Sequence, residues 1–451
     1  MHWGVATSAY QVEGAWDEGG RAPSVWDTFA HQPGNIRGDA NGDVACDMYH
    51  RYKEDFKLMR AMGVKHYRFS FSWSRILPQG GRGTAVNEEG AAFYDALIYE
   101  MLAQGITPAA TMFHWDLPQA LQDKYQGPLG PEFVDDFVAY ADVLFERYGD
   151  RVKHWITFNE PWITCYLSYG IGVFAPGHKG GDPDQYKCGH HLILAHARTK
   201  ELAVSKYPRQ GAKLGMSLNI EWPEPMSDSA EDKAAAGRAM MMQLGWFADP
   251  LYFGMYPLLM TKKFADQAWW ADFTPEERRL VRGSADFFGI NFYTGKYVSA
   301  NGDPLGYQIS DYKDGQPIGP LAQSNWLRVV PESLYKLCRY VTMRYGAPDI
   351  WITENGVSAP GEASMPVEQA VHDAFRVDYF RSYLANLCRA KAEGARVAAY
   401  YAWSFMDNFE WREGFGERFG IVHVALGTPG LKRTEKDSGK FLEQFFRADT
   451  N

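Results

Sequence analysis

Residues 52–72 read YKEDFKLMRAMGVKHYRFSFS, and this stretch contains the pattern that decides the fold. Residues 52–62 carry apolar side chains at helical spacing, and Gly63 is the residue type that most often follows the end of a helix. Residues 64–72 form a run with Phe, Tyr and Val, which is typical of a buried strand. A helix, a glycine stop and a strand together indicate a parallel sheet.

The same pattern recurs along the chain. Strand-like runs lie at 4–9, 64–72, 107–115, 152–159, 213–220, 286–293, 349–353 and 396–404. Helix-like segments lie at 52–62, 87–104, 131–148, 189–207, 331–345 and 366–393. We expect residues 1–451 to form a single catalytic domain, an α/β fold of the (β/α)8 TIM-barrel type with long βα loops. An open sheet that binds a dinucleotide would carry GxGxxG after its first strand, and this chain does not.

The amino-acid composition excludes some classes of binding partner. The 451 residues include 55 acidic and 46 basic side chains, a net charge of −9, which argues against binding nucleic acid or anionic lipid. No apolar run approaches the roughly 18 residues of a membrane span, so we expect no membrane partner. Aromatic residues make up 15% of the chain, including 15 Trp, and their faces suit sugar rings.

The cysteines suggest a reducing compartment. Five of them are scattered without a CxxC pair, so we expect buried free thiols at Cys46, Cys165, Cys188, Cys338 and Cys388. The sequence contains no Asn-x-Ser/Thr site and opens without a charged and then apolar signal segment. These features predict a cytoplasmic protein.

A histidine cluster near Cys188 raises the question of a metal. His190, His191 and His196 do not have the i, i+4 spacing of HExxH, so a packed helix is the better interpretation. We expect no metal and no cofactor.

Polar side chains gather where the predicted strands end. In a (β/α)8 barrel the carboxyl ends of the strands form the active-site face. The residues at or just beyond these ends are Gln11, Glu13, Arg68, Trp73, His114, Trp115, Asp116, Asn159, Glu160, Asn219, Glu221, Asn291, Tyr293, Glu354, Asn355 and Trp403. A barrel without a site has no reason to collect this set on one rim.

Glu160 and Glu354 are the central pair. They end the fourth and seventh runs, so a closed barrel places them across the mouth from each other. A single Glu is usually a surface charge, but each of these follows an apolar strand and adjoins an Asn. Cleavage of a glycosidic bond requires such a pair, one protonated and one ionised.

The neighbouring residues fit that chemistry. Asn159 can donate to a sugar 2-hydroxyl, and Arg68 and Tyr293 can keep a carboxylate ionised. Gln11, His114 and Glu410 offer polar groups that can form hydrogen bonds with sugar hydroxyls. Trp403 and Trp411 offer ring faces on which a sugar ring can pack. Each aromatic residue taken alone would equally fit core packing.

Six segments carry a resemblance to a known family. They are ATSAYQVEGA (6–15), YRFS (67–70), FHWDLP (113–118), TFNEP (157–161), ITENG (352–356) and WSFMDNFEW (403–411). In this order, across nearly the whole chain, they resemble family 1 glycoside hydrolases, and their detail resembles β-glucosidases.

The resemblance implies a role for each matching residue. Glu160 would be the general acid/base and Glu354 the nucleophile, with Arg68 supporting the nucleophile. Substrate would be bound by Gln11, His114, Trp115, Asn159, Asn291, Tyr293, Trp326, Trp403, Glu410 and Trp411. Trp162 and Leu167 would line the entrance. The family also often has a cis bond at the position of Trp403–Ser404.

The sequence thus predicts a retaining β-glucosidase that acts on small β-glucosides or short β-linked oligosaccharides. Retention would require carboxyl groups roughly 5–5.5 Å apart, against about 6.5–9.5 Å for inversion. An anionic Glu410 would repel a phosphate, so we expect an unphosphorylated sugar.

Alternatives remain open at this point. They are a β-galactosidase or β-fucosidase of the same family, a non-catalytic sugar-binding barrel, and a barrel that uses a metal. The presence of both glutamates weighs against a non-catalytic barrel. The sequence does not indicate the oligomeric state. The family's usual residues before the first strand are missing, so we expect that strand to be short or frayed.

Overall fold

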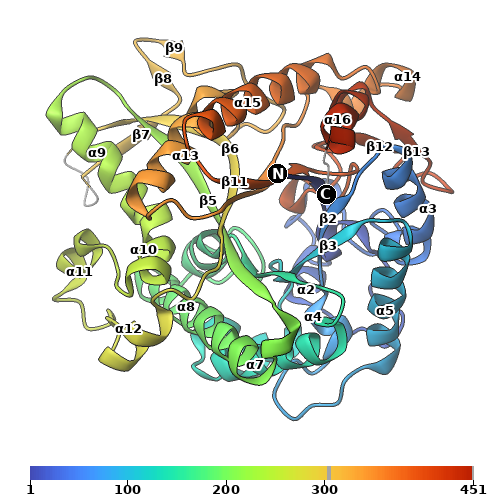
Figure 1. Ribbon diagram of the computed structural model, residues 1–451, viewed down its shortest axis with the longest axis horizontal. Coiled ribbons are helices and arrows are strands. Elements are labelled where there is room, and N and C mark those ends of the chain that lie inside the picture. Colours follow the sequence, from blue (N-terminus) through green and yellow to red (C-terminus); the bar gives the residue numbers. More distant parts are fainter. Residues whose placement is uncertain (302–305, 449–451) are drawn as a thin grey trace.

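A closed barrel of eight parallel strands forms the centre of the protein (Figure 1). The computed structural model describes residues 1–301 and 306–448. The barrel strands are β1 (His2–Ala6), β2 (His66–Ser70), β3 (Thr107–Phe113), β4 (His154–Asn159), β5 (Lys213–Pro225), β6 (Phe288–Ser299), β10 (Ile350–Asn355) and β11 (Val397–Trp403). They pair in the order β10-β11-β1-β2-β3-β4-β5-β6, and β6 pairs with β10 to close the barrel.

Helices surround the barrel (Figure 1). They are α1 (Ala9–Val12), α2 (Val25–Ala30), α3 (Met48–Ala61), α4 (Trp73–Ile76), α5 (Glu88–Ala103), α6 (Gln119–Tyr125), α7 (Glu132–Tyr148), α8 (Gly181–Lys206), α9 (Ala230–Met240), α10 (Trp246–Phe253), α11 (Leu258–Phe264), α12 (Pro275–Val281), α13 (Glu332–Arg344), α14 (Val367–Ala370), α15 (Ala374–Ala392) and α16 (Asp437–Ala448). Two π-helical segments, η3 (Ile163–Gly170) and η5 (Met241–Gly245), follow β4 and α9. None of the helices within residues 1–301 and 306–448 is both long and apolar enough to span a bilayer.

The loops contain several short helical turns and strands. Five 3₁₀ turns are η1 (Arg37–Asp39), η2 (Gly127–Leu129), η4 (Pro208–Gln210), η6 (Glu362–Ser364) and η7 (Trp411–Glu413). The remaining strands are β7 (Gln308–Ser310), β8 (Tyr312–Lys313), β9 (Gln316–Pro317), β12 (Val422–Val424) and β13 (Arg433–Glu435). Strand β7 adds antiparallel to the outer end of β6 and so extends one wall of the barrel mouth.

The eight predicted strands and the barrel architecture are confirmed, but the helices differ from the prediction in several places. The predicted helix 366–393 is divided into α14 and α15. Helices α1, α2, α4, α6 and α16 were not predicted, and neither were helices α9 to α12. Pro250 inside α10 and the π-helical η5 interrupt the helical spacing there. The first strand is short, but it is not frayed, because all five residues pair with β11 and three of them also pair with β2.

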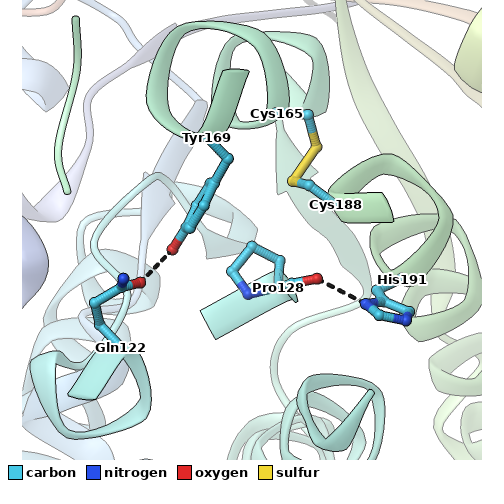
Figure 2. Close-up of a disulfide and its surroundings, with 6 residues drawn as sticks. All are labelled: Gln122, Pro128, Cys165, Tyr169, Cys188 and His191. Atoms are coloured by element: carbon cyan, nitrogen blue, oxygen red, sulfur yellow. Dashed lines mark hydrogen bonds between the residues drawn. A yellow bond between two sulfur atoms is a disulfide. The ribbon is translucent and has the colours of Figure 1, made fainter. Parts of the chain in front are cut away.

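The expectation of five buried free thiols is wrong. Cys165 in η3 and Cys188 in α8 form a disulfide, with their Cα atoms 5.4 Å apart (Figure 2). Cys46 and Cys338 are free and buried, whereas Cys388 is free and exposed. The chain folds η3 back against α8, and this pairing leaves no sign in the local sequence. The cysteines therefore no longer argue for a reducing compartment.

Removing this disulfide is expected to lower stability. The bond closes a loop between residues 23 positions apart, and cross-links of that length typically contribute about 3 kcal/mol. A Cys165→Ala/Cys188→Ala double variant should unfold at lower temperature and lower denaturant concentration than the native chain. Cys388→Ala, which removes an exposed free thiol, is the matched control. Equal unfolding midpoints for the double variant and the oxidised native chain would contradict the prediction.

Candidate active site

A cleft of about 480 Å³ opens among the carboxyl ends of the barrel strands. The predicted site residues that line it are His114, Trp115, Asn159, Glu160, Trp162, Leu167, Asn291, Tyr293, Trp326, Glu354, Trp403, Glu410 and Trp411. Arg68 and Gln11 are buried beside the cleft and do not line it. The barrel thus brings residues from distant parts of the chain into one site, as the strand-end rule predicts.

Glu354, near the end of β10, has two strong hydrogen-bond donors. Arg68 Nη1 donates to Oε1 at 2.7 Å, and the Tyr293 hydroxyl donates to Oε2 at 2.6 Å. Burial raises the pKa of Glu354, and the charge of Arg68 and the hydroxyl of Tyr293 oppose that shift. Both carboxylate oxygens therefore accept a hydrogen bond, and these donors favour the anion against the effect of burial.

Glu160 follows β4 and has a different environment. Its backbone φ is +46°, which is uncommon for a residue other than glycine, and its N–H donates to the Ser217 carbonyl at 2.8 Å. Asn291 Nδ2 donates to its Oε1 at 2.9 Å. Burial and the nearby Glu354 charge raise the pKa of Glu160 to about 8. Glu160 is therefore the member of the pair that holds a proton near neutral pH.

These two environments divide the carboxyl groups by protonation state. Among the donors to the pair from the described residues, Arg68 alone has a permanent charge, and it bonds to Glu354 and not to Glu160. Such a pair can supply a proton on one side of the cleft and an anion on the other. Two carboxyl groups with separated pKa values mark an acid and a base or nucleophile.

Asn159 connects the pair to His114. Its Oδ1 accepts from Arg68 Nη2 at 2.6 Å and from Asn291 Nδ2 at 2.9 Å. Its Nδ2 must therefore donate to His114 Nε2, 3.0 Å away. Burial and the charge of Arg68 lower the pKa of His114 well below its usual value, so the ring is neutral and carries its proton on Nδ1. That buried Nδ1 has no hydrogen-bond partner among the described residues.

Indole rings form the apolar part of the cleft. The ring of His114 stacks with Trp403 and with Trp411, each at a centroid distance of 5.9 Å. Trp411 also packs on Trp115 at 4.4 Å and on buried Trp26 at 4.5 Å. Packing from behind fixes the Trp411 ring in place, which suits a surface that receives a sugar ring.

The loop after β11 positions Glu410. It begins with a cis peptide bond at Trp403–Ser404, as the resemblance implied. Asn408 Nδ2 donates to Ser404 Oγ at 2.8 Å, and Gln11 Nε2 donates to Asn408 Oδ1 at 3.0 Å and approaches Glu410 Oε2 at 3.4 Å. The amide of Gln11 therefore holds the loop.

The protonation state of Glu410 differs from the expectation. Burial and the neighbouring carboxyl groups of Glu417, Glu354 and Glu160 raise the pKa of Glu410 well above its usual value. These surroundings favour the neutral acid, so repulsion of phosphate by a Glu410 anion is not an argument about the substrate. A neutral Glu410 can both donate to and accept from a sugar hydroxyl.

Several lining residues were not assigned from the sequence. Asn219 and Glu221 were expected at a strand end but were given no role. A polar residue at a strand end is itself a sign of a site residue, so this position could have identified them. The others are Ile163, Phe174, Ile220, Pro223, Ala239, Met242, Gln243, Thr294, Lys296, Val298, Tyr307, Ile309 and Phe419. Many of these lie on η3, α9, η5 and the outer parts of β6 and β7, where no local pattern indicates that a side chain faces a cleft.

The histidines near Cys188 have protein partners. His191 Nδ1 bonds to the Pro128 carbonyl at 2.7 Å (Figure 2), and His196 Nδ1 bonds to Thr157 Oγ1 at 2.7 Å. His190 Nδ1 lies 3.0 Å from the Tyr256 hydroxyl. Within residues 1–301 and 306–448, no group of three or more His, Cys, Asp or Glu side chains is arranged to hold a metal ion.

Comparisons with known proteins agree with this site. The sequence model of glycosyl hydrolase family 1 matches residues 1–450. Beta-glucosidase 42 of Arabidopsis thaliana is 46% identical over 461 residues, which cover 99% of this chain and 93% of that protein. The structure of a GH1 β-glucosidase from the fungus Humicola insolens in complex with glucose has a TM-score of 0.95 and 43% identity, covering 99% of this chain and 97% of that one. A mutant rice β-glucosidase in a covalent complex with Glc has a TM-score of 0.95 and 42% identity, covering 100% of this chain and 98% of that one. The chain therefore belongs to glycosyl hydrolase family 1.

Proposed function

We propose that the protein is a retaining β-glucosidase that releases terminal, non-reducing β-D-glucosyl residues from small β-glucosides and short β-linked oligosaccharides. The observation that carries the proposal is the unequal pair of carboxyl groups in the cleft. Glu160 is held protonated by burial and by the Glu354 charge, and Glu354 is held as an anion by Arg68 and Tyr293.

In the first step, Glu354 attacks the anomeric carbon while Glu160 gives its proton to the departing oxygen. The bond from the anomeric carbon to that oxygen breaks, and an ester bond to a Glu354 oxygen forms. Asn159 contacts Arg68 and Asn291, which bond to the two carboxyl groups, and its second Nδ2 hydrogen can donate to the 2-hydroxyl, where a hydrogen bond strengthens in the transition state.

In the second step, Glu160 removes a proton from water, and the water oxygen displaces Glu354 from the anomeric carbon. Once Glu354 is an uncharged ester, its charge no longer raises the pKa of Glu160. Glu160 can therefore change from acid to base within one cycle. Two displacements at one carbon retain the β configuration.

The relatives support glucose as the sugar. The Arabidopsis relative is named a β-glucosidase, and the Humicola structure contains glucose. The rice complex is covalent, as a glycosyl-enzyme intermediate requires. A preference for galactose or fucose is the second candidate within the family, and the comparisons do not favour it.

A panel of aryl β-glycosides tests the proposal, together with proton NMR of the product formed first. We expect fastest hydrolysis of the β-glucoside and release of β-glucose before mutarotation. The α anomer as first product would exclude a retaining mechanism. Faster hydrolysis of the β-galactoside or β-fucoside would replace glucose as the preferred sugar.

The dependence of kcat/KM on pH follows from the same two groups. Activity requires protonated Glu160, so kcat/KM should fall about tenfold per pH unit as the pH rises above the Glu160 pKa of about 8. Activity also requires ionised Glu354, so kcat/KM should fall on the acid side as Glu354 takes up a proton. Initial rates for an aryl β-glucoside across the pH range check this. A constant kcat/KM through the alkaline limb would contradict the role of Glu160.

A further inference from the structure

Six charged side chains form a buried ionic cluster beneath two loops of the cleft. They are Glu362, Asp373, Asp407, Arg376, Arg418 and Lys436. Each side chain is at most 11% exposed, and the three acids balance the three bases. None of the six is among the described residues that line the cleft. Any effect of the cluster on the reaction must therefore pass through the loops.

Asp407 connects the cluster to the β11 loop (residues 404–410), which carries Glu410. Its Oδ1 accepts hydrogen bonds from Lys436 Nζ at 2.6 Å and from the Gly420 N–H at 3.0 Å. Burial alone would raise the pKa of Asp407, but the surrounding cations, Lys436 foremost, outweigh it and lower that pKa below its usual value. Asp407 is therefore an anion three residues before Glu410, and it is the second anchor of this loop besides the Gln11 amide.

The other partner of Lys436 lies on the β10 loop (residues 356–366), which follows the strand of Glu354. Lys436 Nζ also donates to Glu362, within η6 of this loop. Glu362 accepts a further bond from Arg376, which itself donates to the Val357 carbonyl at 3.0 Å. Val357 stands three residues after Glu354. One buried ammonium group thus joins the β11 loop to the β10 loop.

The backbone on both sides of Lys436 is fixed. Lys436 lies between β13 and α16, near the end of the chain (Figure 1), and its N–H donates to the Ile421 carbonyl at 3.0 Å. Strand β13 pairs with β12, and the Ser438 hydroxyl in α16 donates to Asp373 at 2.6 Å. The ammonium group is therefore held from a rigid segment that contributes no side chain to the cleft within the described residues.

We infer that Lys436 is a positioning residue, which holds Glu410 at the correct place relative to Glu354 by bonding to Asp407 and Glu362. This inference rests on the proposed hydrolase function. A sugar hydroxyl bound by Glu410 fixes where the anomeric carbon lies, and a shift of about 1 Å in such a position can cost about 100-fold in rate. Without the ammonium group, no bond would join Asp407 to Glu362, and the two loops could move apart.

Lys436→Met tests the inference, because methionine keeps most of the stem and removes the charge. We expect kcat/KM for 4-nitrophenyl β-glucoside to fall about 10- to 100-fold. Glucose should also bind more weakly, which a higher Ki for competitive inhibition would report. Both are measured well below the unfolding midpoint of the variant. A native kcat/KM in Lys436→Met would overturn the inference.

A double-mutant cycle with Glu410→Ala separates positioning from a general loss of packing. If Lys436 acts through Glu410, adding Lys436→Met to the Glu410→Ala variant should lower kcat/KM by about threefold or less. An activated aryl β-glucoside keeps the residual rates measurable. The same large factor in both backgrounds would overturn the inference.

Two further variants address stability. Lys436→Met leaves an unbalanced negative charge in the interior, which can unfold the chain. Lys436→Met/Asp407→Asn keeps the charges balanced but restores no link between the loops, so it should have a higher unfolding midpoint than Lys436→Met and still show the loss in kcat/KM. A native kcat/KM in this double variant would contradict the inference.

Arg344→Met is the matched control for a lost ion pair. Arg344 on α13 bonds to buried Asp249 on α10, and neither is among the described residues that line the cleft. This variant should have a lower unfolding midpoint and keep a kcat/KM close to that of the native chain. A loss in Arg344→Met equal to that in Lys436→Met would overturn the inference alone, whereas a native chain that hydrolyses no β-glucoside would overturn the proposed function.

Discussion

Replacing Glu354 with glycine is expected to lower kcat for aryl β-glucosides by about 10⁴- to 10⁶-fold, the loss typical of removing a nucleophile. Glu354 is the group that forms the new bond in the proposed first step, and it accepts hydrogen bonds from both Arg68 and Tyr293. Steady-state kinetics with native and variant protein measure the loss. Glu368→Gln, which changes an exposed acid on α14, is the control for the removal of a carboxylate.

Added azide or formate should restore part of the activity of Glu354→Gly. A small anion can occupy the space of the missing carboxylate and attack the anomeric carbon from the same face. With azide the product should be the α-glucosyl azide, because only one displacement then occurs. NMR of the product distinguishes this from residual native enzyme, which would still give β-glucose. If Glu354→Gly retained native turnover, another residue would be the nucleophile.

Replacing Glu160 with alanine is expected to have an effect that depends on the leaving group. Loss of general acid catalysis typically costs about 10²- to 10⁴-fold. We expect kcat/KM for β-linked disaccharides to fall by that factor, because a sugar alkoxide cannot depart without a proton. A 2,4-dinitrophenyl leaving group needs no proton, so kcat/KM for that glucoside should change little, and it serves as the internal control.

The second step should also slow in Glu160→Ala, because no base then activates water. Azide needs no base, so it should accelerate turnover of the dinitrophenyl substrate and give the β-glucosyl azide. The alkaline limb of the pH profile should disappear together with the Glu160 carboxyl, whose pKa is about 8 in the native site. Equal losses for both leaving groups, with the alkaline limb intact, would contradict the acid/base role. The two variants should give glucosyl azides of opposite anomeric configuration, and this difference distinguishes the role of Glu354 from that of Glu160.

Much of the fold follows from local patterns. All eight strands lie at or within a few residues of their predicted positions, because each is a short apolar run and those after the first follow a turn or a helix with a glycine stop. Gly63 and Gly105 adopt positive φ where α3 and α5 end, as their place in the pattern requires. Residues between β5 and β6 were less predictable, since Pro250 and η5 break the regular helical spacing of apolar side chains.

Most of the candidate site could also be predicted from the sequence, because the last residues of parallel strands lie on one face of a barrel. Glu160, Glu354, Asn291 and Tyr293 all line the cleft for this reason. Asn219 and Glu221 obey the same rule, and only their chemical role was left open.

The sequence alone determined where helices and strands form, which residues stand at the strand ends, and the pair of glutamates. These features depend on local spacing and on a barrel topology in which all strands run in the same direction and end on one face. Tertiary structure alone decided how those residues interact. Arg68 reaches Glu354 across 286 residues of sequence, and Gln11 supports the Glu410 loop. The Cys165–Cys188 bond and the raised pKa of Glu410 likewise arise from packing between distant segments. Hydrogen bonds, burial and pKa shifts depend on which atoms meet in space, and local sequence does not encode that proximity.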